Sequence, residues 1–322
     1  MATYKEVIGT AITNIAGDSP TTVNGDVWYN SSTSIFKFNT VLTAAWSTGG
    51  NLPTGTQELA GAGTQTEGLA FGGENPGADQ TNATYEYNGS AWTGGGNLTT
   101  ARYQLAGAGT QTAGLAFGGV ASGGSRSNAT EEYNGSSWTN GGNMGTARER
   151  LAGAGTQTAG LAVAGDVGPK QQTEEYNGSS WTSGGNLGTA RYWLAGAGIQ
   201  TAGLVFGGAP PTGGLTATEE YNGTSWTNGG ALGTARYKLA GCGLQTAALA
   251  FGGIVTGGVK VANTELYDGS SWTASAAMGT ARSILGGAGT QTAGLAFGGS
   301  IGDKNQTEEF ISGAGTVGIT TT

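Results

Sequence analysis

The sequence contains no histidine among its 322 residues and only one cysteine, Cys242. Missing histidines remove the commonest general base, proton shuttle and metal ligand from the protein's chemistry. A single cysteine cannot form a disulfide within the chain. Cys242 also takes a position that alanine holds in similar segments, which predicts a small buried side chain. We therefore expect no metal, no cofactor and no enzymatic activity.

Charged residues are scarce as well, at 11% of the chain, with 13 Lys+Arg against 21 Asp+Glu and a net charge of −8. An acidic chain without a basic run is poorly suited to a phosphate backbone or an anionic membrane surface. No apolar run is long enough for a membrane helix, and the first residues lack the apolar core of a secretory signal. We expect neither a nucleic-acid partner nor membrane insertion.

What the chain does contain is a repeat, marked by a tryptophan every 43 to 46 residues. The unit reads Thr-Glu-Glu-Tyr-Asn-Gly-Ser-Ser-Trp-Thr, then Gly-Thr-Ala-Arg, then Leu-Ala-Gly-Ala-Gly and Gly-Leu-Ala-Phe-Gly-Gly. The marking residues are Trp46, Trp92, Trp138, Trp181, Trp226 and Trp272. A period of roughly 40 to 50 residues with short apolar runs and glycine is typical of a propeller or a solenoid.

Short apolar runs that stop at glycine indicate strands, and no stretch keeps a helical period. Thr-Glu-Glu-Tyr is followed by Asn-Gly, a strong hairpin signal, and by the tryptophan segment. Each unit thus provides four antiparallel strands, which make one propeller blade. Six Gly-Gly columns predict six blades and an all-β fold.

The two ends of the repeat array complement each other. The last unit stops after Phe310 without a tryptophan strand, whereas Trp46 precedes the first complete unit. The simplest closure puts the Trp46 strand into the final blade, which removes exposed sheet edges. Phe36 to Phe38 could compete with Glu308 to Phe310 for the third-strand position. The predicted domains are an N-terminal attachment segment (1–33), the propeller (34–310) and a C-terminal tail (311–322).

The column order resembles the kelch repeat: Gly-Gly, then Glu-x-Tyr, then Trp138, then Met144 and Arg148 six and ten residues later. The resemblance covers about residues 34–310 and implies a six-bladed kelch-like β-propeller. Its arginine recurs as Arg102, Arg148, Arg191, Arg236 and Arg282, and its glutamate as Glu131, Glu174, Glu219, Glu265 and Glu308. One pair per blade predicts a repeated ion pair, because a catalytic site would be asymmetric.

Three positions depart from this pattern. Thr56 stands in the arginine column, Tyr85 in the glutamate column, and Val163-Ala164-Gly165 replaces one Phe-Gly-Gly. Outside the repeat, the segment from Asn24 to Phe38 resembles the G-D-x-W-Y-N-x-x-T hairpins of phage tail-fibre and other virion proteins. That resemblance implies an attachment segment that contacts other virion proteins; an N-terminal strand covering one propeller face is the alternative.

The candidate binding site lies where the repeats differ. The loops after Gly-Gly vary, and so does a residue pair directly after Thr-Ala-Arg, whereas the Thr-Gln-Thr and Asn-Gly turns are nearly constant. In an up-and-down blade the variable positions share one face. Large side chains there suit recognition. The predicted partner-binding residues are Tyr103, Gln104, Glu149, Arg150, Tyr192, Trp193, Tyr237 and Lys238.

The expected function is a non-enzymatic phage virion adhesin or decoration protein that binds a host cell-surface glycan or protein. A virion protein released by host lysis needs no signal peptide. One alternative is a self-assembling virion or filament subunit, a homo-oligomer that docks through the constant Thr-Gln-Thr face. Another is a cellular kelch-type glycan- or protein-binding module.

Overall fold

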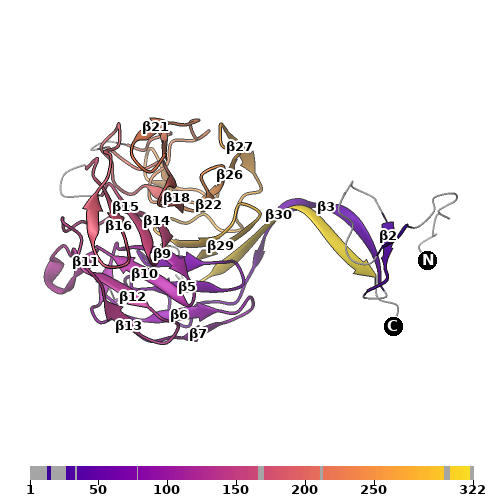
Figure 1. Ribbon diagram of the computed structural model, residues 1–322, viewed down its shortest axis with the longest axis horizontal. Coiled ribbons are helices and arrows are strands. Elements are labelled where there is room, and N and C mark those ends of the chain that lie inside the picture. Colours follow the sequence, from indigo (N-terminus) through magenta and orange to yellow (C-terminus); the bar gives the residue numbers. More distant parts are fainter. Residues whose placement is uncertain are drawn as a thin grey trace. The chain divides into compact units, whose positions relative to one another are not determined.

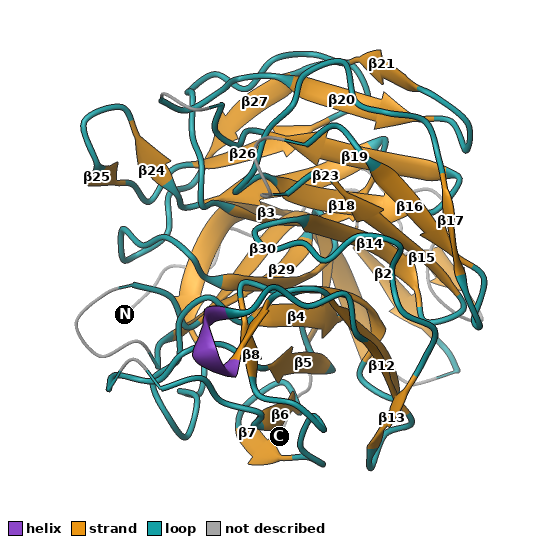
Figure 2. Ribbon diagram, turned by 90° about the vertical axis from the view of Figure 1, so that its left-hand side faces the viewer, coloured by secondary structure: helices purple, strands orange, loops and turns teal. Residues whose placement is uncertain are grey.

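The computed structural model describes residues 13–15, 27–32, 35–77, 79–165, 170–210, 213–300 and 305–319. The chain divides into two compact units, one of residues 45–310 and one of residues 1–44 together with 311–322. Residues 45–310 form a six-bladed β-propeller, as predicted, with four antiparallel strands in each blade (Figures 1 and 2). The only helical element among the described residues is a short 3-10 turn, Ser122–Gly124.

The first strands of blades 1 to 6 surround the axis and carry the Leu-Ala-Gly-Ala-Gly segment. They are β4 (Ala60–Gly63), β9 (Ala106–Thr110), β14 (Ala152–Thr156), β18 (Ala195–Ile199), β22 (Ala240–Leu244) and β28 (Gly286–Gly289). The glycine in the middle is required by close approach, since a Cβ on Gly153 would lie 2.5 Å from the Gly107 carbonyl oxygen of the neighbouring blade. Small residues here let six strands meet around one axis.

The second strands carry Gly-Leu-Ala-Phe and are buried along most of their length. They are β5 (Gly68–Phe71), β10 (Ala113–Phe117), β15 (Ala159–Val163), β19 (Ala202–Phe206), β23 (Ala247–Phe251) and β29 (Ala293–Phe297). Cys242 pairs with Leu249 across the first two strands of blade 5 and is buried, as predicted. Burial raises the pKa of its thiol to about 12, which makes it an inert core residue.

The third strands carry Thr-Glu-Glu-Tyr: β6 (Thr84–Tyr87), β12 (Thr130–Tyr133), β16 (Thr173–Tyr176), β20 (Thr218–Tyr221), β26 (Thr264–Tyr267) and β30 (Thr307–Ile319). The fourth strands begin with tryptophan in blades 1 to 5: β7 (Trp92–Gly94), β13 (Trp138–Asn140), β17 (Trp181–Ser183), β21 (Trp226–Asn228) and β27 (Trp272–Ser275). All four strands predicted for each unit are therefore present.

Blade 6 is completed from the other end of the chain. Its sheet continues from β28 and β29 to β30 and then to β3 (Ile35–Thr48), which carries Trp46. The predicted closure is confirmed. Residues 36–38 belong to β3 and pair with β2 (Val27–Asn30), so the third-strand position goes to β30. β2 in turn pairs in parallel with β1 (Thr13–Ile15).

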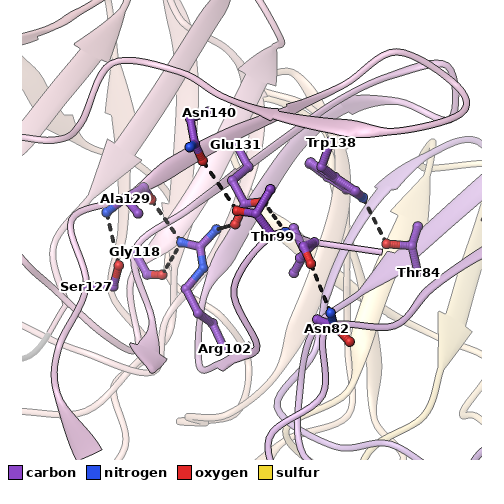
Figure 3. A network of polar contacts seen from close by, with 11 residues as sticks. Asn82, Thr84, Thr99, Arg102, Gly118, Ser127, Ala129, Glu131, Trp138 and Asn140 are labelled. Atoms are coloured by element: carbon purple, nitrogen blue, oxygen red, sulfur yellow. Dashed lines mark hydrogen bonds and ion pairs between the residues drawn. The ribbon is translucent and has the colours of Figure 1, made fainter. Parts of the chain in front are cut away.

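The repeated tryptophan joins each blade to the one before it. Trp138 packs on Phe71 of blade 1 with ring centroids 4.9 Å apart, and its indole N–H donates to Thr84 Oγ1 at 2.9 Å (Figure 3). The closing blade repeats the arrangement, because Trp46 packs on Phe251 at 5.2 Å and donates to Thr264 Oγ1 at 3.0 Å. An aromatic contact combined with a hydrogen bond thus fixes five of the six blade boundaries. At the boundary between blades 3 and 4, where Val163 replaces phenylalanine, Trp226 keeps the hydrogen bond to Thr173 Oγ1 at 2.9 Å and packs against an aliphatic cluster that includes Val163.

The constant Thr-Gln-Thr turn serves the same boundary. In blade 3 the Gln157 amide donates to the carbonyl oxygens of Gly114 and Tyr133 in blade 2, at 3.1 and 2.6 Å. Every blade has an equivalent glutamine, namely Gln65, Gln111, Gln157, Gln200, Gln245 and Gln291. The central residue of this turn is therefore constant because it links neighbouring blades.

We expect Gln157→Ala to lower the free energy of unfolding by about 1–2 kcal/mol, because two part-buried carbonyls lose their donor. Denaturant unfolding measures the change. Thr158→Ala, at an exposed position of the same turn, is the control and is expected to stay within about 0.5 kcal/mol of the parent. If both variants lost the same free energy of unfolding, the hydrogen bonds of Gln157 would not contribute to stability.

A third boundary contact joins tyrosine to glutamate. The Tyr133 hydroxyl donates to Glu86 Oε1 of blade 1 at 2.6 Å. Burial, and next the hydrogen bond to Glu86, raise the pKa of Tyr133 to about 12. The pKa values of Tyr87, Tyr176, Tyr221 and Tyr267 are raised to about 12 by the same causes.

These tyrosines predict alkaline unfolding. A tyrosine pKa raised in the folded state favours folding fully below pH 10, and that contribution is lost as the pH rises to about 12. We expect the thermal midpoint to fall across this window, with tyrosinate absorbance from these residues rising together with loss of structure. A midpoint that stays constant across the window would contradict the role of the buried hydroxyls.

Candidate functional site

The first residue of each variable pair lies beside the variable loop of its own blade. Tyr103 in β8 (Arg102–Tyr103) pairs with Val120 in β11 (Val120–Ala121). Tyr192 bridges to Ala209 in the same way, and so does Tyr237 to Ile254 at the start of β24 (Ile254–Val255), which pairs with β25 (Val259–Lys260). The structure thus places the variable pair and the variable loops together, as the repeat pattern predicted.

The second residue of each pair belongs to a ring around the propeller axis. The backbone N–H of Gln104 donates to the carbonyl oxygen of Glu58 at 2.9 Å, and the backbone N–H of Arg150 donates to the carbonyl oxygen of Gln104 at 3.0 Å. The pattern continues around the axis until Glu58 donates to Ile284 and closes the ring. We call Glu58, Gln104, Arg150, Trp193, Lys238 and Ile284 the axial ring.

All six residues of the axial ring have left-handed backbone, with φ between 50° and 57°. Only one other non-glycine residue among the described ranges has a positive φ, Ala164, whereas 28 glycines do. Left-handed backbone costs a non-glycine residue roughly 1–2 kcal/mol, most for bulky or β-branched side chains such as those of Trp193 and Ile284. Nearly all other described positions with positive φ are glycine, whereas the six positions of the axial ring carry side chains.

The side chains of the axial ring contact one another in sequence. The Gln104 amide donates to Glu58 Oε2 at 2.8 Å, and Arg150 Nε donates to Gln104 Oε1 at 3.1 Å. Two cations lie over the Trp193 ring, the Arg150 guanidinium at 5.2 Å and the Lys238 ammonium at 4.7 Å from its centroid. The result is a polar arc with a carboxylate at one end and two cations around an indole at the other.

The axial ring lines a cavity of about 70 Å³. Its other lining residues are the leucines that follow the ring residues, Leu59, Leu105, Leu151, Leu194, Leu239 and Leu285. The same leucines, with the Ala-Gly segments of the first strands, line a second cavity of about 120 Å³ further along the axis. We call these six leucines the leucine collar. The collar lies between the two cavities and forms an apolar floor beneath the axial ring.

Burial perturbs the ionisable groups of the cavity. It raises the pKa of the Glu58 carboxyl, an effect that the hydrogen bond from Gln104 partly offsets. Burial also lowers the pKa of the Lys238 amine, against the opposing attraction of Glu58. Desolvation raises the pKa of the neighbouring Tyr103 hydroxyl as well. Charges in such surroundings interact more strongly than charges in open water.

The predicted site residues fall into two groups. Gln104, Arg150, Trp193 and Lys238 meet in the axial ring. Tyr103, Glu149, Tyr192 and Tyr237 occupy the adjoining first positions, where Glu149 is buried and forms an ion pair with Arg126 at 3.1 Å. Residues 78, 166–169, 211–212 and 301–304 of the predicted variable loops lie outside the described residues.

Two features of the site escaped the sequence-based prediction, the leucine collar that forms the floor of the axial ring and the left-handed backbone of the ring. Glu58 and Ile284 complete the axial ring; they stand in the variable column of the repeats but were not among the predicted partner-binding residues. The left-handed backbone had no signal in the sequence, because none of the ring residues is glycine.

The repeated arginines and glutamates form buried ion pairs, as predicted. Arg102 Nη2 lies 2.8 Å from Glu131 Oε1, and Arg102 Nη1 donates to the carbonyl oxygens of Gly118 and Ala129 (Figure 3). The same pair recurs in the next four blades at 2.7–2.9 Å. Each arginine is fully buried, which places these groups inside the blades.

Blade 1 lacks this ion pair through two linked departures. Thr56 replaces the arginine and Tyr85 replaces the glutamate of the same blade, so both charges are absent together. Thr56 is buried and its hydroxyl donates to the Thr54 carbonyl at 3.1 Å. A single replacement would have left one buried charge unpaired.

The described residues contain no group of three or more histidine, cysteine, aspartate or glutamate side chains placed to hold a metal ion. They also contain no helix with the length and hydropathy needed to cross a membrane. No family model matches the sequence, and no curated protein is similar to it.

Proposed function

We propose that this protein is a non-enzymatic recognition protein that binds its partner with the face carrying the axial ring and the variable loops. The observation that carries the proposal is the strained backbone of the axial ring. Six different side chains are held at positive φ around one axis, whereas the other described residues with positive φ are glycine except for Ala164. Strain of this kind is typically retained where side chains serve function.

The repeated residues support the same conclusion, because they make contacts that hold the propeller together. The tryptophan, glutamine and tyrosine columns bind the preceding blade, and arginine and glutamate pair within a blade. Their constancy across blades thus has a structural cause. The backbone of the second residue in each pair has the same role in every blade, but the side chains of the variable pairs have none in common, so their diversity suits a surface that distinguishes partners.

A binding role also agrees better with the chemistry than catalysis does. The chain has no histidine, and its repeated acids and bases are committed to ion pairs. At the axis, Glu58 accepts from Gln104, and the two cations lie over Trp193. This arrangement offers hydrogen bonds, charge and an aromatic surface to a ligand, which are the means of recognition.

We further infer that the blades are of the kelch type and that the protein is a phage virion component, an adhesin or a fibre or capsid decoration. The support is the residue-level resemblance of the repeat and of the Asn24–Phe38 segment. Within that segment β2 and β3 form a hairpin in which Asn30 pairs with Ile35. In this proposal the N-terminal segment attaches to other virion proteins, and the propeller face binds a host cell-surface glycan or protein.

Immunogold electron microscopy tests the virion assignment. Antibody against the recombinant protein is applied to particles released from the source culture. We expect gold on fibres or capsid surfaces. Gold confined to cells or free material would reject the virion role and leave a cellular kelch-type binding protein.

A second candidate, a self-associating structural subunit, is favoured by one observation on the opposite face. Ile199 and Leu244 stand where other blades have the first threonine of Thr-Gln-Thr, and they are 46% and 56% exposed. Neighbouring blades thus present apolar side chains that could bury against another copy. Sedimentation of the parent and of an Ile199→Thr, Leu244→Thr variant tests it; a monomeric parent rejects this role.

A further inference from the structure

We propose that two grooves on the outer strands of the propeller, one in blade 3 and one in blade 5, each bind one neutral sugar residue of a glycan. We call them the blade 3 groove and the blade 5 groove. The inference goes beyond the proposed function, because no residue of the axial ring lines either groove.

Both grooves occupy the same place in the repeat. On one side lies the connection that enters the blade, with Gly145 and Thr146 in blade 3 and Gly233 and Thr234 in blade 5. On the other side lie the start of the third strand and the end of the fourth. The cavity volumes are about 540 Å³ in blade 3 and about 340 Å³ in blade 5. Sites for small molecules commonly measure about 300–1,000 Å³, so each groove has room for a sugar ring.

The charges in the grooves favour an uncharged ligand. Among the described residues, the lining of each groove holds one carboxylate, Glu174 or Glu265, and no lysine or arginine. Each carboxylate pairs through Oε1 with a fully buried arginine, at 2.7 Å in blade 3 and 2.8 Å in blade 5. An anionic ligand would therefore meet a carboxylate without an accessible cation, and a cationic ligand would meet a carboxylate that is already neutralised.

The glycine of the entering connection keeps the second carboxylate oxygen within reach of a ligand. The Gly145 N–H donates to Glu174 Oε2 at 2.6 Å, and the Gly233 N–H donates to Glu265 Oε2 at 2.6 Å. A Cβ on these glycines would lie 3.2 and 3.1 Å from that oxygen, so a larger residue would cover it. A carboxylate oxygen accepts more than one hydrogen bond, which leaves Oε2 able to accept from a sugar hydroxyl.

The exposure of the repeated tryptophan follows the same glycine. In four blades the entering connection has glycine and the tryptophan is half-buried: Gly145 with Trp181, Gly188 with Trp226, Gly233 with Trp272 and Gly279 with Trp46. In the other two, Pro53 and Thr99 replace the glycine, and Trp92 and Trp138 are 6% and 5% exposed. Trp272 lines the blade 5 groove beside Ser275 and Asn263. An indole beside polar groups combines apolar contact with hydrogen bonding, as a sugar ring requires.

Blade 2 shows how threonine closes this position. The Thr99 hydroxyl donates to Asn140 Oδ1 of the fourth strand at 3.3 Å (Figure 3). The Thr99 N–H keeps the hydrogen bond to the carboxylate, donating to Glu131 Oε2 at 2.6 Å. The fold therefore accepts threonine here, and a glycine-to-threonine substitution copies an arrangement that the protein already contains.

Titration with neutral glycosides tests the proposal. The methyl glycosides of glucose, galactose, mannose and N-acetylglucosamine are added at millimolar concentrations to the full chain and followed by ligand-observed NMR. We expect at least one of them to bind, and the double variant Gly145→Thr, Gly233→Thr to bind it about tenfold more weakly or not at all. Absence of binding by all four glycosides would overturn the proposal.

Gly94→Thr is the matched control. It makes the same change at an exposed position of blade 1, where a Cβ would meet no described atom within 4 Å. This variant should bind the glycoside like the parent. Circular dichroism and thermal unfolding confirm that each variant is folded. If the folded double variant also binds like the parent, the grooves are not the sugar sites.

Further outcomes separate this inference from the proposed function. If galacturonate binds more tightly than methyl galactoside, the charge argument is wrong. If a Ser-Gly-Ser peptide binds and the glycosides do not, the ligand of the grooves is a protein. If binding to cells requires the axial ring but no glycoside binds the parent, the recognition face is correct and only the groove inference fails.

Discussion

Arg102→Thr is expected to lower the free energy of unfolding by about 3–5 kcal/mol, because it leaves the Glu131 carboxylate buried without its cation. Both side chains are almost completely buried, at 0% and 1% exposure. The arginine also donates to Gly118 and Ala129, so these carbonyls lose a donor as well. Denaturant unfolding at neutral pH measures the loss.

Blade 1 provides the compensating change. Thr56 and Tyr85 show that a blade of this fold tolerates the absence of both charges. The double variant Arg102→Thr, Glu131→Tyr should therefore be more stable than Arg102→Thr alone. Losses that simply add would show that the two positions are not coupled.

An ion pair with one exposed partner serves as the comparison for this series. Arg126 and Glu149 lie 3.1 Å apart; the arginine side chain is 43% exposed, whereas that of Glu149 is 9% exposed. Arg126→Thr should cost less than Arg102→Thr, because water already reaches the pair from the arginine side. A cost as large as that of Arg102→Thr would mean that burial does not control these pairs.

Replacing Tyr192 with alanine and Trp193 with glycine is expected to weaken partner binding by about thirtyfold or more while the protein stays folded. Large aromatic side chains at the centre of an interface commonly contribute about 2 kcal/mol or more each when removed. Glycine is chosen for position 193 because φ there is 56°, where alanine would keep the backbone strain. Removing the indole also removes the surface over which Arg150 and Lys238 lie.

The stability of that variant is the first check on its meaning. Glycine relieves left-handed strain but makes the unfolded chain more flexible, so the two effects oppose each other. We expect a thermal midpoint close to that of the parent. A large fall in the midpoint would mean that Trp193 supports the fold, and Tyr192→Ala alone would then carry the binding test.

The fold could be predicted because its determinants repeat. Tryptophan, glutamate and arginine recur at the spacing of one blade, and the incomplete unit at each end showed how the ring closes. The ion pairs followed from the same repetition. The connection between Thr56 and Tyr85 could not be predicted, because it depends on where each residue lies within the blade. That placement requires the pairing register of the strands.

The site could be predicted only in part. Variation among repeats located the face and eight of its residues, but it could not divide the pairs into an outer position and an axial one. That division depends on backbone torsion, since the second residue turns left-handed and hydrogen bonds around the axis. The sequence allowed the constant Thr-Gln-Thr turn to be interpreted as a docking surface. In the structure its glutamine donates hydrogen bonds to the neighbouring blade.

Binding of the labelled full-length protein to intact cells of the source culture, measured by flow cytometry, tests the central claim most directly. The parent is compared with the Tyr192→Ala, Trp193→Gly variant and with Ile199→Thr, which restores the repeated threonine on the opposite face. We predict saturable binding by the parent and by Ile199→Thr, and its loss in the axial variant. Equal binding by all three proteins, or loss only in Ile199→Thr, would contradict recognition through the axial face.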